Sequence, residues 1–523
     1  MHKTEVLIVG GGLAGLTAAI SSASNGSDTT IVTKTMVGGA NTTSIAAGIF
    51  TSAMSSEDSR ELHYMDTINA GYSLNDKALV KTMVNDAPKY FKKLLELGIE
   101  IDYGPVYLPG HSKPRGYVIK GKGVELQKIL RGKCKELGVK FIENTLITSL
   151  ISDGSKIIGA IGIRMDTMEI IGVLANSIIL ATGGFGEIYP YTLMPKGSSG
   201  YGASLGLRAG AEVIDMEFVQ FYPTMIAEEG LPRLFVNYES LLKFGADIVD
   251  ENEISIFKKN KINEPHKITR DALSILMAKE MEKGNSLYLD CRGIKDEDVA
   301  SSEILAWAIG SLESKGVPVR KRKIKVSPYA HFFMGGLRAD ANCATNIPGL
   351  FVAGEAMGGV HGANRIGGNA LTACMVFGFR AGLSASLYCG TVDFGSENLI
   401  KLEASRLMDY IKAEGSKNAN EVISTIREKM WNNVGIIRNR KGLEEALSTF
   451  NSLRDYKLSN SIEKIIVQMM LDCAEVISLS ALIREESRGS HYRSDFPNMS
   501  NEWLKKIMIK IEKNECKVSF IYV

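Results

Sequence analysis

The stretch TEVLIVGGGLAGLTAA, residues 4–19, decides the fold of this chain. Residues 5–9 form an apolar, β-branched run typical of a buried parallel strand. Residues 10–15 then follow the pattern G-x-G-x-x-G, an apolar run of helical spacing extends to residue 23, and residues 29–33 form a second β-rich run. In such a unit the glycines let the backbone approach a pyrophosphate, whose charge lies at the positive end of the helix dipole. The sequence therefore predicts a dinucleotide-binding domain.

Three further segments extend this prediction. Residues 38–48 are rich in glycine and in small or hydroxyl side chains, which suits either a loop running under a flat ligand or a flexible surface loop. Residues 177–180 and 350–352 are strands that end on glycine-containing turns, the second of them followed by Glu355. Strand ends of this kind meet bound cofactors in open parallel sheets.

Composition excludes several classes of protein. The 523 residues are 45% hydrophobic and 23% charged, which is enough for about three globular domains. The net charge is +2 and no long basic block occurs, so nucleic acid is not an expected partner. No secretory leader and no uninterrupted apolar run of about 18 residues is found, so we predict no membrane span.

The seven cysteines are scattered, without a C-x-x-C pair or a His/Cys cluster at metal spacing. This distribution predicts a reducing, cytoplasmic setting, no metal site and no disulfide framework. It also lacks the spacing of iron–sulfur ligands, so any electron relay beyond the cofactor must lie on another protein or be replaced by a diffusing acceptor.

Together these motifs resemble one superfamily: the flavoprotein subunits of succinate dehydrogenase and fumarate reductase, with L-aspartate oxidase. The resemblance runs along nearly the whole chain. Beyond residues 10–15 and 38–48 it includes HYMDTINAGYSLND (63–76), ATGGFGEIYP (181–190), RAGAEVIDMEFVQFYPT (208–224), SPYAHFFMGGL (327–337), FVAGEAMGGVHGANRIGGNAL (351–371) and REESRGSHYRSDFP (484–497). LPGHSKPR (108–115) looks more like the aspartate oxidase branch.

The resemblance implies FAD as the cofactor. The family's flavin contacts carry over to Gly10, Gly12, Gly15, Thr33, Lys34, Gly39, Asn41, Thr42, Gly48, Ala181, Thr182, Glu355, Arg365, Asn369 and Leu371. Succinate dehydrogenases of the family bind FAD covalently through a histidine, and Asn41 stands at that position here. Because asparagine cannot form that bond, we expect non-covalent FAD, with a lower potential that favours fumarate reduction or an oxidase. Tyr201 also departs from the family's G-D-G turn and puts one flavin contact in question.

The same resemblance implies a catalytic set. His331 and Arg365 correspond to the clamp on one substrate carboxylate, and the planar fork of Arg365 matches a carboxylate with two parallel donors. Arg270 corresponds to the arginine that delivers or takes the substrate proton, and Glu239 to the carboxylate that relays protons to it. The alternative for Arg270 is a solvated residue paired with Asp271.

The far end of the expected substrate site departs from the family. Tyr222 replaces a carboxylate-binding histidine, and Tyr238 lies where the family has a threonine. A tyrosine donates one hydrogen bond but brings no positive charge and adds bulk. We therefore expect Tyr222 and Tyr238 to contact the substrate, whose second carboxylate is bound more weakly or is replaced by a different or larger group.

We expect an α/β fold with a doubly wound FAD-binding domain (residues 1–224 and 335–395), an inserted α+β capping domain (225–334) and a helical C-terminal domain (396–523). The predicted function is an FAD-dependent oxidoreductase that moves a hydride between flavin N5 and the carbon backbone of a small carboxylic acid. The alternatives are L-aspartate oxidase, using oxygen or fumarate as acceptor, and a non-catalytic FAD-binding electron-transfer subunit.

The partners expected from the resemblance follow from this function. A small carboxylic acid is the substrate, and an iron–sulfur electron-transfer subunit is a candidate partner through which the chain would associate with the inner face of the membrane. A homo-oligomer is a further expectation.

Overall fold

The first strand, β1 (His2–Val9), lies inside a seven-stranded sheet with the order β6-β2-β1-β9-β8-β7, in which β16 also pairs with β9. The structure is a computed structural model of the whole chain and describes residues 1–195, 201–413, 415–458, 462–512 and 515–523. The pairs from β6 to β9, and β16 with β9, are parallel; β7 and β8 join by antiparallel pairing. The other strands are β2 (Thr29–Val32), β6 (Lys140–Ile142), β7 (Thr145–Ser152), β8 (Ile157–Arg164), β9 (Ile170–Leu180) and β16 (Leu350–Val352).

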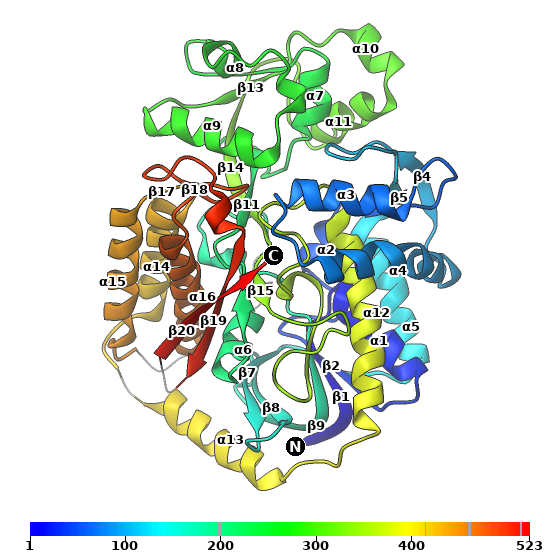
Figure 1. Cartoon of the computed structure of the whole chain (residues 1–523), viewed down its shortest axis with the longest axis vertical. Coiled ribbons are helices and arrows are strands. Elements are labelled where there is room, and N and C mark those ends of the chain that lie inside the picture. The colour runs from blue at the N-terminus through cyan, green and yellow to red at the C-terminus, as the bar shows by residue number, and fades with distance from the viewer. Residues whose placement is uncertain (196–200, 414, 459–461, 513–514) are drawn as a thin grey trace.

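Two helices pack closely against each other beside this sheet, α1 (Leu13–Ser24) and α12 (Asn369–Cys389) (Figure 1). Glycines make the close crossing feasible, because a Cβ at Gly378 would lie 2.0 Å from the Thr17 hydroxyl oxygen. Helices α4 (Lys77–Glu96) and α5 (Lys122–Glu136) pack against α12 and α1 respectively. The strand–turn–helix–strand unit predicted from residues 4–33 is therefore present.

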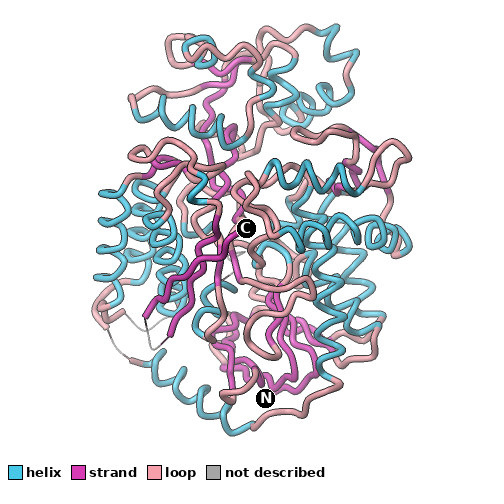
Figure 2. The backbone as a smooth tube through the Cα atoms, in the orientation of Figure 1, coloured by secondary structure: helices cyan, strands magenta, loops and turns pink. Residues whose placement is uncertain are grey.

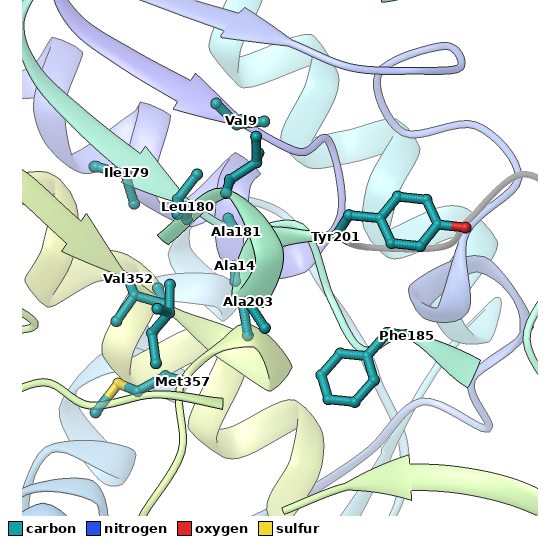
Figure 3. Close-up of a cluster of buried hydrophobic side chains, with 14 of the residues drawn as sticks. Val9, Ala14, Ile179, Leu180, Ala181, Phe185, Tyr201, Ala203, Val352 and Met357 are labelled. Carbon is teal, nitrogen blue, oxygen red and sulfur yellow. The ribbon is translucent and has the colours of Figure 1, made fainter. Parts of the chain in front are cut away.

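The ends of the parallel strands pack around an aliphatic core (Figure 3). Val9, Leu180 and Val352, from three neighbouring strands, are almost completely buried there. Tyr201 stands at the margin of this cluster, and its ring points away from the aliphatic side chains (Figure 3). Burying these side chains holds the glycine-rich turns that follow the strands in fixed positions.

A smaller sheet and short helices cover one side of the strand ends. The sheet has the order β3-β5-β4. Its strands are β3 (Ile49–Thr51), β4 (Ile101–Val106) and β5 (Gly116–Ile119), and the helical elements near the glycine-rich turns are α2 (Thr42–Ile45), α3 (Arg60–Ala70), η1 (Gly186–Ile188), α6 (Gly202–Arg208) and η3 (Gly354–Ala356).

The capping segment forms its own layer, at the top of Figure 1. Strands β11 (Val219–Ile226) and β14 (Ile324–Phe333) are paired with each other and link this layer to the rest of the molecule. The remaining elements are β12 (Asp247–Val249), β13 (Tyr288–Asp290), α7 (Tyr238–Lys243), α8 (Ile256–Lys259), η2 (Pro265–Lys267), α9 (Arg270–Glu282), α10 (Asp296–Ser301) and α11 (Glu303–Glu313). The segment has a separate hydrophobic core, so it is built as a unit of its own.

The C-terminal region is helical, as expected, but it ends in a β-hairpin that the sequence patterns did not predict. Its helices are α13 (Glu397–Lys412), α14 (Ala419–Val434), α15 (Arg440–Arg454), α16 (Glu463–Ile483) and η4 (Asn501–Trp503). Strands β19 (Lys505–Glu512) and β20 (Glu515–Tyr522) extend a sheet with β10 (Val213–Ile214) and β15 (Gly336–Leu337), and β17 (Ile437–Arg438) pairs with β18 (Tyr492–Arg493). The tube in Figure 2 shows this hairpin crossing the face of the molecule.

Among the described residues, α12 and α16 are long and apolar enough to cross a membrane by length and composition. More than half of each apolar stretch is buried inside the protein, which is the pattern of core helices in a folded domain.

Candidate active site

One large cavity, of about 430 Å³, runs from the glycine-rich turns to the capping segment. Its lining includes residues from β1, α1, β2, α2, β7, β11, α9, β14 and α12, and from the turn that follows β9. The predicted site residues that line it are Gly10, Gly12, Thr33, Lys34, Asn41, Thr42, Ala181, Thr182, Tyr222, Glu239, Arg270, His331, Glu355, Arg365 and Leu371. Gly15, Gly39, Gly48, Tyr238 and Asn369 are outside this lining. Residues from separated parts of the chain thus meet at one site.

The glycines of the first turn are required by the geometry at one end of the cavity. Gly10 has a φ of +119°, and a Cβ there would lie 2.2 Å from the Ala181 carbonyl oxygen. A Cβ at Gly15 would lie 2.0 Å from the Gly10 carbonyl oxygen. Gly12 is the N-cap of α1 and provides no side-chain cap. The Leu13 N–H donates to the Thr43 hydroxyl, and the other N–H groups of the first turn can meet a ligand anion.

The donor set at this end fits a dinucleotide. Thr182 lines the cavity, and among the described residues its buried hydroxyl has no hydrogen-bond partner. Lys34 lines the same end, with its ammonium 5.5 Å from the ring centroid of Tyr201. A narrow backbone turn, a helix N-terminus, a lysine and an unsatisfied hydroxyl together match the needs of a pyrophosphate and its sugars.

Asn41 serves as the N-cap of the short helix α2. Its side-chain oxygen accepts hydrogen bonds from the backbone N–H groups of Thr43 (2.9 Å) and Ser44 (3.2 Å). Its amide nitrogen donates to the Gln127 side-chain oxygen at 2.6 Å. The Asn41 side chain is therefore held by the protein while it lines the cavity.

Glu355 is a buried carboxyl beside the cavity. One of its oxygens accepts a hydrogen bond from the Phe333 N–H at 3.0 Å. Burial raises the pKa of Glu355 to about 7, against the opposing effects of backbone hydrogen bonds and Arg365. A carboxyl at this place can accept hydrogen bonds from sugar hydroxyls.

A buried pair of side chains, Arg365 and His331, lies further along the cavity. One terminal nitrogen of Arg365 lies 3.0 Å from His331 Nε2 and also donates to the Gln220 side-chain oxygen at 2.9 Å. Because arginine only donates, His331 Nε2 must accept. Burial and the neighbouring arginines lower the pKa of His331 well below its usual value, so this histidine is neutral.

Arg365 keeps unused donors. Among the described residues its buried Nε has no hydrogen-bond partner. Burial, together with Arg270, lowers the pKa of Arg365 to about 9, which still leaves the guanidinium charged at neutral pH. A charged group with free donors, facing a cavity, suits a carboxylate ligand.

Arg270 enters the cavity from the first residue of α9. Its Nε lies 3.6 Å from a carboxylate oxygen of Glu239, and its guanidinium carbon lies 5.1 Å from the ring centroid of Tyr222. Asp271, the alternative partner considered for Arg270, instead accepts hydrogen bonds from the Tyr72 hydroxyl and the Asn364 amide. Arg270 and Glu239 therefore stand as a pair at the cavity.

Both tyrosines of the far end direct their hydroxyls toward the protein. Tyr222 donates to the Val236 carbonyl at 3.0 Å, and Tyr238 donates to the Ile268 carbonyl at 3.1 Å. Tyr222 still lines the cavity with its ring, while Tyr238 packs behind it, with the two ring centroids 6.1 Å apart. The hydroxyl hydrogen bonds that we expected the two tyrosines to make with a substrate are therefore made within the protein.

A buried polar network under the start of α12 was not identified from the sequence. Arg115 donates to both oxygens of Asp58, to Asp66 and to His111 Nδ1. Since His111 Nδ1 accepts, its Nε2 carries the proton and donates to the Gly367 carbonyl at 2.8 Å. In the sequence, residues 108–115 show only a family resemblance, and no periodicity or motif points to this role.

Asn369, which begins α12, is tied down in the same way. Its side-chain oxygen accepts from the Thr51 hydroxyl at 2.6 Å and lies 2.9 Å from His63 Nε2, and its amide donates to the Thr67 hydroxyl. The side chain therefore fixes the helix start, and what faces the cavity from this turn is Gly368, Ala370 and Leu371. In the described part of the chain, no group of three His, Cys, Asp or Glu side chains is arranged to hold a metal ion.

Two protein-family models match the chain. A model described as FAD binding domain matches residues 5–371, and one described as fumarate reductase flavoprotein C-term matches residues 424–523. The first of these spans well over half of the sequence.

Relatives of known function cover nearly the whole chain. A fumarate reductase (CoM/CoB) subunit of Methanothermobacter marburgensis is 34% identical, over 97% of this chain and 97% of its own length. L-aspartate oxidase of Saccharolobus solfataricus is 32% identical, over 97% of this chain and 100% of its own length. A solved E. coli quinol fumarate reductase has a TM-score of 0.87 at 25% identity and covers 100% of this chain and 97% of that one.

Proposed function

The chain belongs to the FAD-binding flavoprotein family that includes fumarate reductase subunits and L-aspartate oxidases, and on that premise we propose how its own residues carry out the reaction. The protein is an FAD-dependent oxidoreductase of the fumarate reductase and succinate dehydrogenase flavoprotein type. In our proposal Arg365 and His331 bind one substrate carboxylate, Arg270 moves the substrate proton and Glu239 relays protons to Arg270.

The observation that carries the proposal is the convergence of these four side chains on one cavity. They come from α7, α9, β14 and the loop before α12, and all four line the same space. The Arg365–His331 contact of 3.0 Å and the Arg270–Glu239 contact of 3.6 Å are the two pairs that the chemistry needs. This arrangement supports the proposed roles of Arg365 and His331 in binding a carboxylate and of Arg270 in proton transfer.

When bound, FAD supplies a two-electron hydride exchange at N5. The protein's part is to hold the substrate and handle the proton. Arg365 binds the carboxylate with charge-assisted hydrogen bonds, and neutral His331 orients the guanidinium. Arg270 gives or takes the proton at a neighbouring carbon, and because an arginine is reprotonated only by a nearby relay, Glu239 serves as that relay.

We further propose that FAD is bound without a covalent link. Support comes from Asn41, whose amide offers no nucleophile and whose side chain already caps α2. Acid precipitation of purified protein tests this point. We expect the yellow FAD to remain in the supernatant, whereas flavin retained in the washed pellet would contradict a non-covalent site.

L-aspartate oxidase activity is the second candidate, favoured by the relative that is 32% identical. An α-amino group is a cation at neutral pH and needs an acidic partner. Of the acids that line the cavity, Glu239 faces Arg270, Glu355 accepts a hydrogen bond from the Phe333 N–H, and Asp102 belongs to β4. This arrangement supports exchange between saturated and unsaturated carbons over amine oxidation.

The two candidates are separated by incubating the enzyme with aspartate in air and, separately, by offering an unsaturated acid to the reduced enzyme without oxygen. We expect reoxidation of the flavin by the unsaturated acid and little hydrogen peroxide from aspartate. Rapid peroxide formation from aspartate, with no reaction of the unsaturated acid, would establish the oxidase instead.

We propose that an iron–sulfur protein serves as the external electron partner, and that the chain resides in the cytoplasm at the inner face of the membrane. The support is that the relative from M. marburgensis is named as one subunit of its enzyme, and that the cysteines of this chain are free and dispersed among the described residues. Co-purification of the tagged chain from its own cells tests the proposal, with an iron-containing protein at a constant ratio as the expected result.

A further inference from the structure

We infer that the substrate of this enzyme is a 2-enoic acid, or its saturated counterpart, that has a single carboxylate and an apolar or aromatic group at the far carbon. The inference rests on the proposed function and specifies its substrate class. It follows from the charge of the substrate end of the cavity and from the side chains that line its far wall.

The charge of the substrate end matches a monoanion. Arg270 and Arg365 bring two positive charges, and the Glu239 carboxylate, 3.6 Å from Arg270, offsets one of them. Glu355 also lines the cavity, and because burial raises its pKa to about 7, it can only lower this sum further. His331 adds none, because its ring nitrogen accepts from Arg365. The remaining single positive charge balances one carboxylate, whereas a dicarboxylate would bring a second negative charge without a partner.

The other cations of the cavity lining are engaged elsewhere. Lys34 follows β2 at the dinucleotide end and lies over the ring of Tyr201. Lys122, at the start of α5, lies 5.2 Å from the ring centroid of Trp307. Burying an unpaired carboxylate costs several kcal/mol, so the lack of a further cation among the described residues of the far wall discriminates against a second acid group.

The far wall of the cavity is formed by Tyr222, Phe235 and Asn237, and it presents aromatic rings to a ligand. Tyr222 presents its ring, because its hydroxyl donates to the Val236 carbonyl. Phe235, which also lines the cavity, meets Tyr222 edge to face, with ring centroids 5.7 Å apart. Asn237 also lines the cavity, but its side-chain oxygen caps α7. Aromatic walls of this kind favour an apolar or aromatic substituent by area and by ring packing.

The reaction of such an acid balances with the groups at hand. In the direction of reduction, bound FAD would supply the hydride and its electron pair to the β-carbon, which is electron-poor because the double bond is conjugated with the carboxylate held by Arg365. The carbon–carbon π bond breaks, and Arg270 gives a proton to the α-carbon and recovers one through Glu239. The products are the saturated acid and oxidised flavin.

The test compares single-carboxylate and two-carboxylate substrates on the intact FAD-loaded enzyme. The flavin is reduced with light in the absence of oxygen, and its reoxidation by crotonate, cinnamate and fumarate is followed by stopped-flow absorbance. We expect crotonate or cinnamate to react with a rate constant at least about tenfold above that of fumarate. In the oxidised enzyme, phenylpropanoate should bind more tightly than succinate, as measured from the change in flavin absorbance.

The outcomes distinguish the inference from the proposed function. A tenfold preference for fumarate over both other acids, with tighter binding of succinate, would overturn the inference while leaving the proposed function intact. If none of the three acids reoxidises the flavin, the proposed function and the inference fail together.

Two variants of Tyr222 sharpen the test. Tyr222→Phe should keep the preference within about threefold, because the ring and not the hydroxyl faces the cavity. Tyr222→His replaces the ring by a smaller polar one, and we expect it to raise the rate with fumarate relative to crotonate by about tenfold. Loss of the preference in Tyr222→Phe would show that the hydroxyl contacts the substrate and would contradict the inference. FAD content and melting temperature confirm that both variants are folded.

Discussion

At the scale of single residues, Arg270 is the group whose removal separates binding from chemistry. It begins α9 and reaches the cavity beside Glu239. We expect Arg270→Ala to retain FAD and its yellow colour while turnover falls by about 10²- to 10⁴-fold, as for loss of a general acid.

The matched control for Arg270 is Arg292→Ala, which removes an exposed arginine of the same segment that pairs with Asp290 and Glu253. Its turnover should stay within about twofold of the unmodified enzyme. If Arg270→Ala kept the turnover of this control, Arg270 would not be the proton donor.

The buried carboxyl of Glu355 predicts a pH-dependent stability. Burial raises its pKa to about 7 from an ordinary value of 4.5, so between these two values the folded protein holds a proton that the unfolded chain has lost. Stability therefore decreases as pH rises through this range. We expect the free energy of unfolding of the FAD-free protein to fall by about 3 kcal/mol between about pH 5 and about pH 8, compared with the change in FAD-free Glu355→Gln over the same range.

Urea unfolding of both FAD-free proteins at the two pH values measures this difference. If the two proteins differ in free energy of unfolding by the same amount at both pH values, Glu355 is ionised throughout and is not held in its acid form by burial.

At the scale of elements, the start of α12 depends on a buried arginine. Arg115 is fully buried and holds Asp58 and Asp66, and through His111 it holds the Gly367 carbonyl. Replacing it by Met would leave two carboxylates without their cation. We expect Arg115→Met to lower the free energy of unfolding by about 3 to 5 kcal/mol and to weaken FAD binding, because the turn beside the cavity loses its support.

Arg164→Met is the control for Arg115, since it breaks the half-exposed pair with Asp166 on the large sheet. Arg164→Met should lower the free energy of unfolding by less than about 1 kcal/mol. Equal effects of the two substitutions in urea unfolding would show that the network under α12 adds no stability.

The elements also show what sequence patterns can and cannot predict. The first strand and helix were predictable, because a buried β-branched run and a glycine turn leave few alternatives for residues 4–24. The hairpin of β19 and β20 was missed, because its second strand is exposed and mixes charged with apolar side chains, so the alternation that marks a half-buried strand is weak.

The candidate site likewise has features that the sequence could predict and features that it could not. Long motifs singled out His331 and Arg365 as the proposed clamp, and the structure brings these two side chains into contact. The hydroxyls of Tyr222 and Tyr238 could not be placed, because their acceptors, the carbonyls of Val236 and Ile268, are backbone atoms that no sequence motif identifies.

At the scale of the whole molecule, buried ion pairs fasten the C-terminal region to the FAD-binding domain. Lys506 of β19 binds Asp215 at 2.7 Å, and Arg484 binds Glu217 at 2.6 Å, with all four side chains almost completely buried. Removing one partner of such a pair leaves the other charge buried without its counter-ion. We expect Lys506→Met to lower the free energy of unfolding by about 3 to 5 kcal/mol.

The matched control is Lys517→Met, on the neighbouring strand β20, where the lysine pairs with Glu515 at the surface. It should change stability by less than about 1 kcal/mol. A loss of stability in Lys506→Met no larger than in this control would mean that the Asp215 carboxyl is accommodated without its cation.

The central claim is that one cavity holds FAD next to a clamp for a carboxylic acid and moves a hydride between them. Its most direct test is a single turnover: enzyme reduced without oxygen is mixed with an unsaturated acid, and the saturated acid is counted against the flavin reoxidised. The account predicts one saturated acid per FAD in the unmodified enzyme and none in Arg365→Met with FAD still bound. Flavin that stays reduced with every unsaturated acid, yet reoxidises in air, would contradict it.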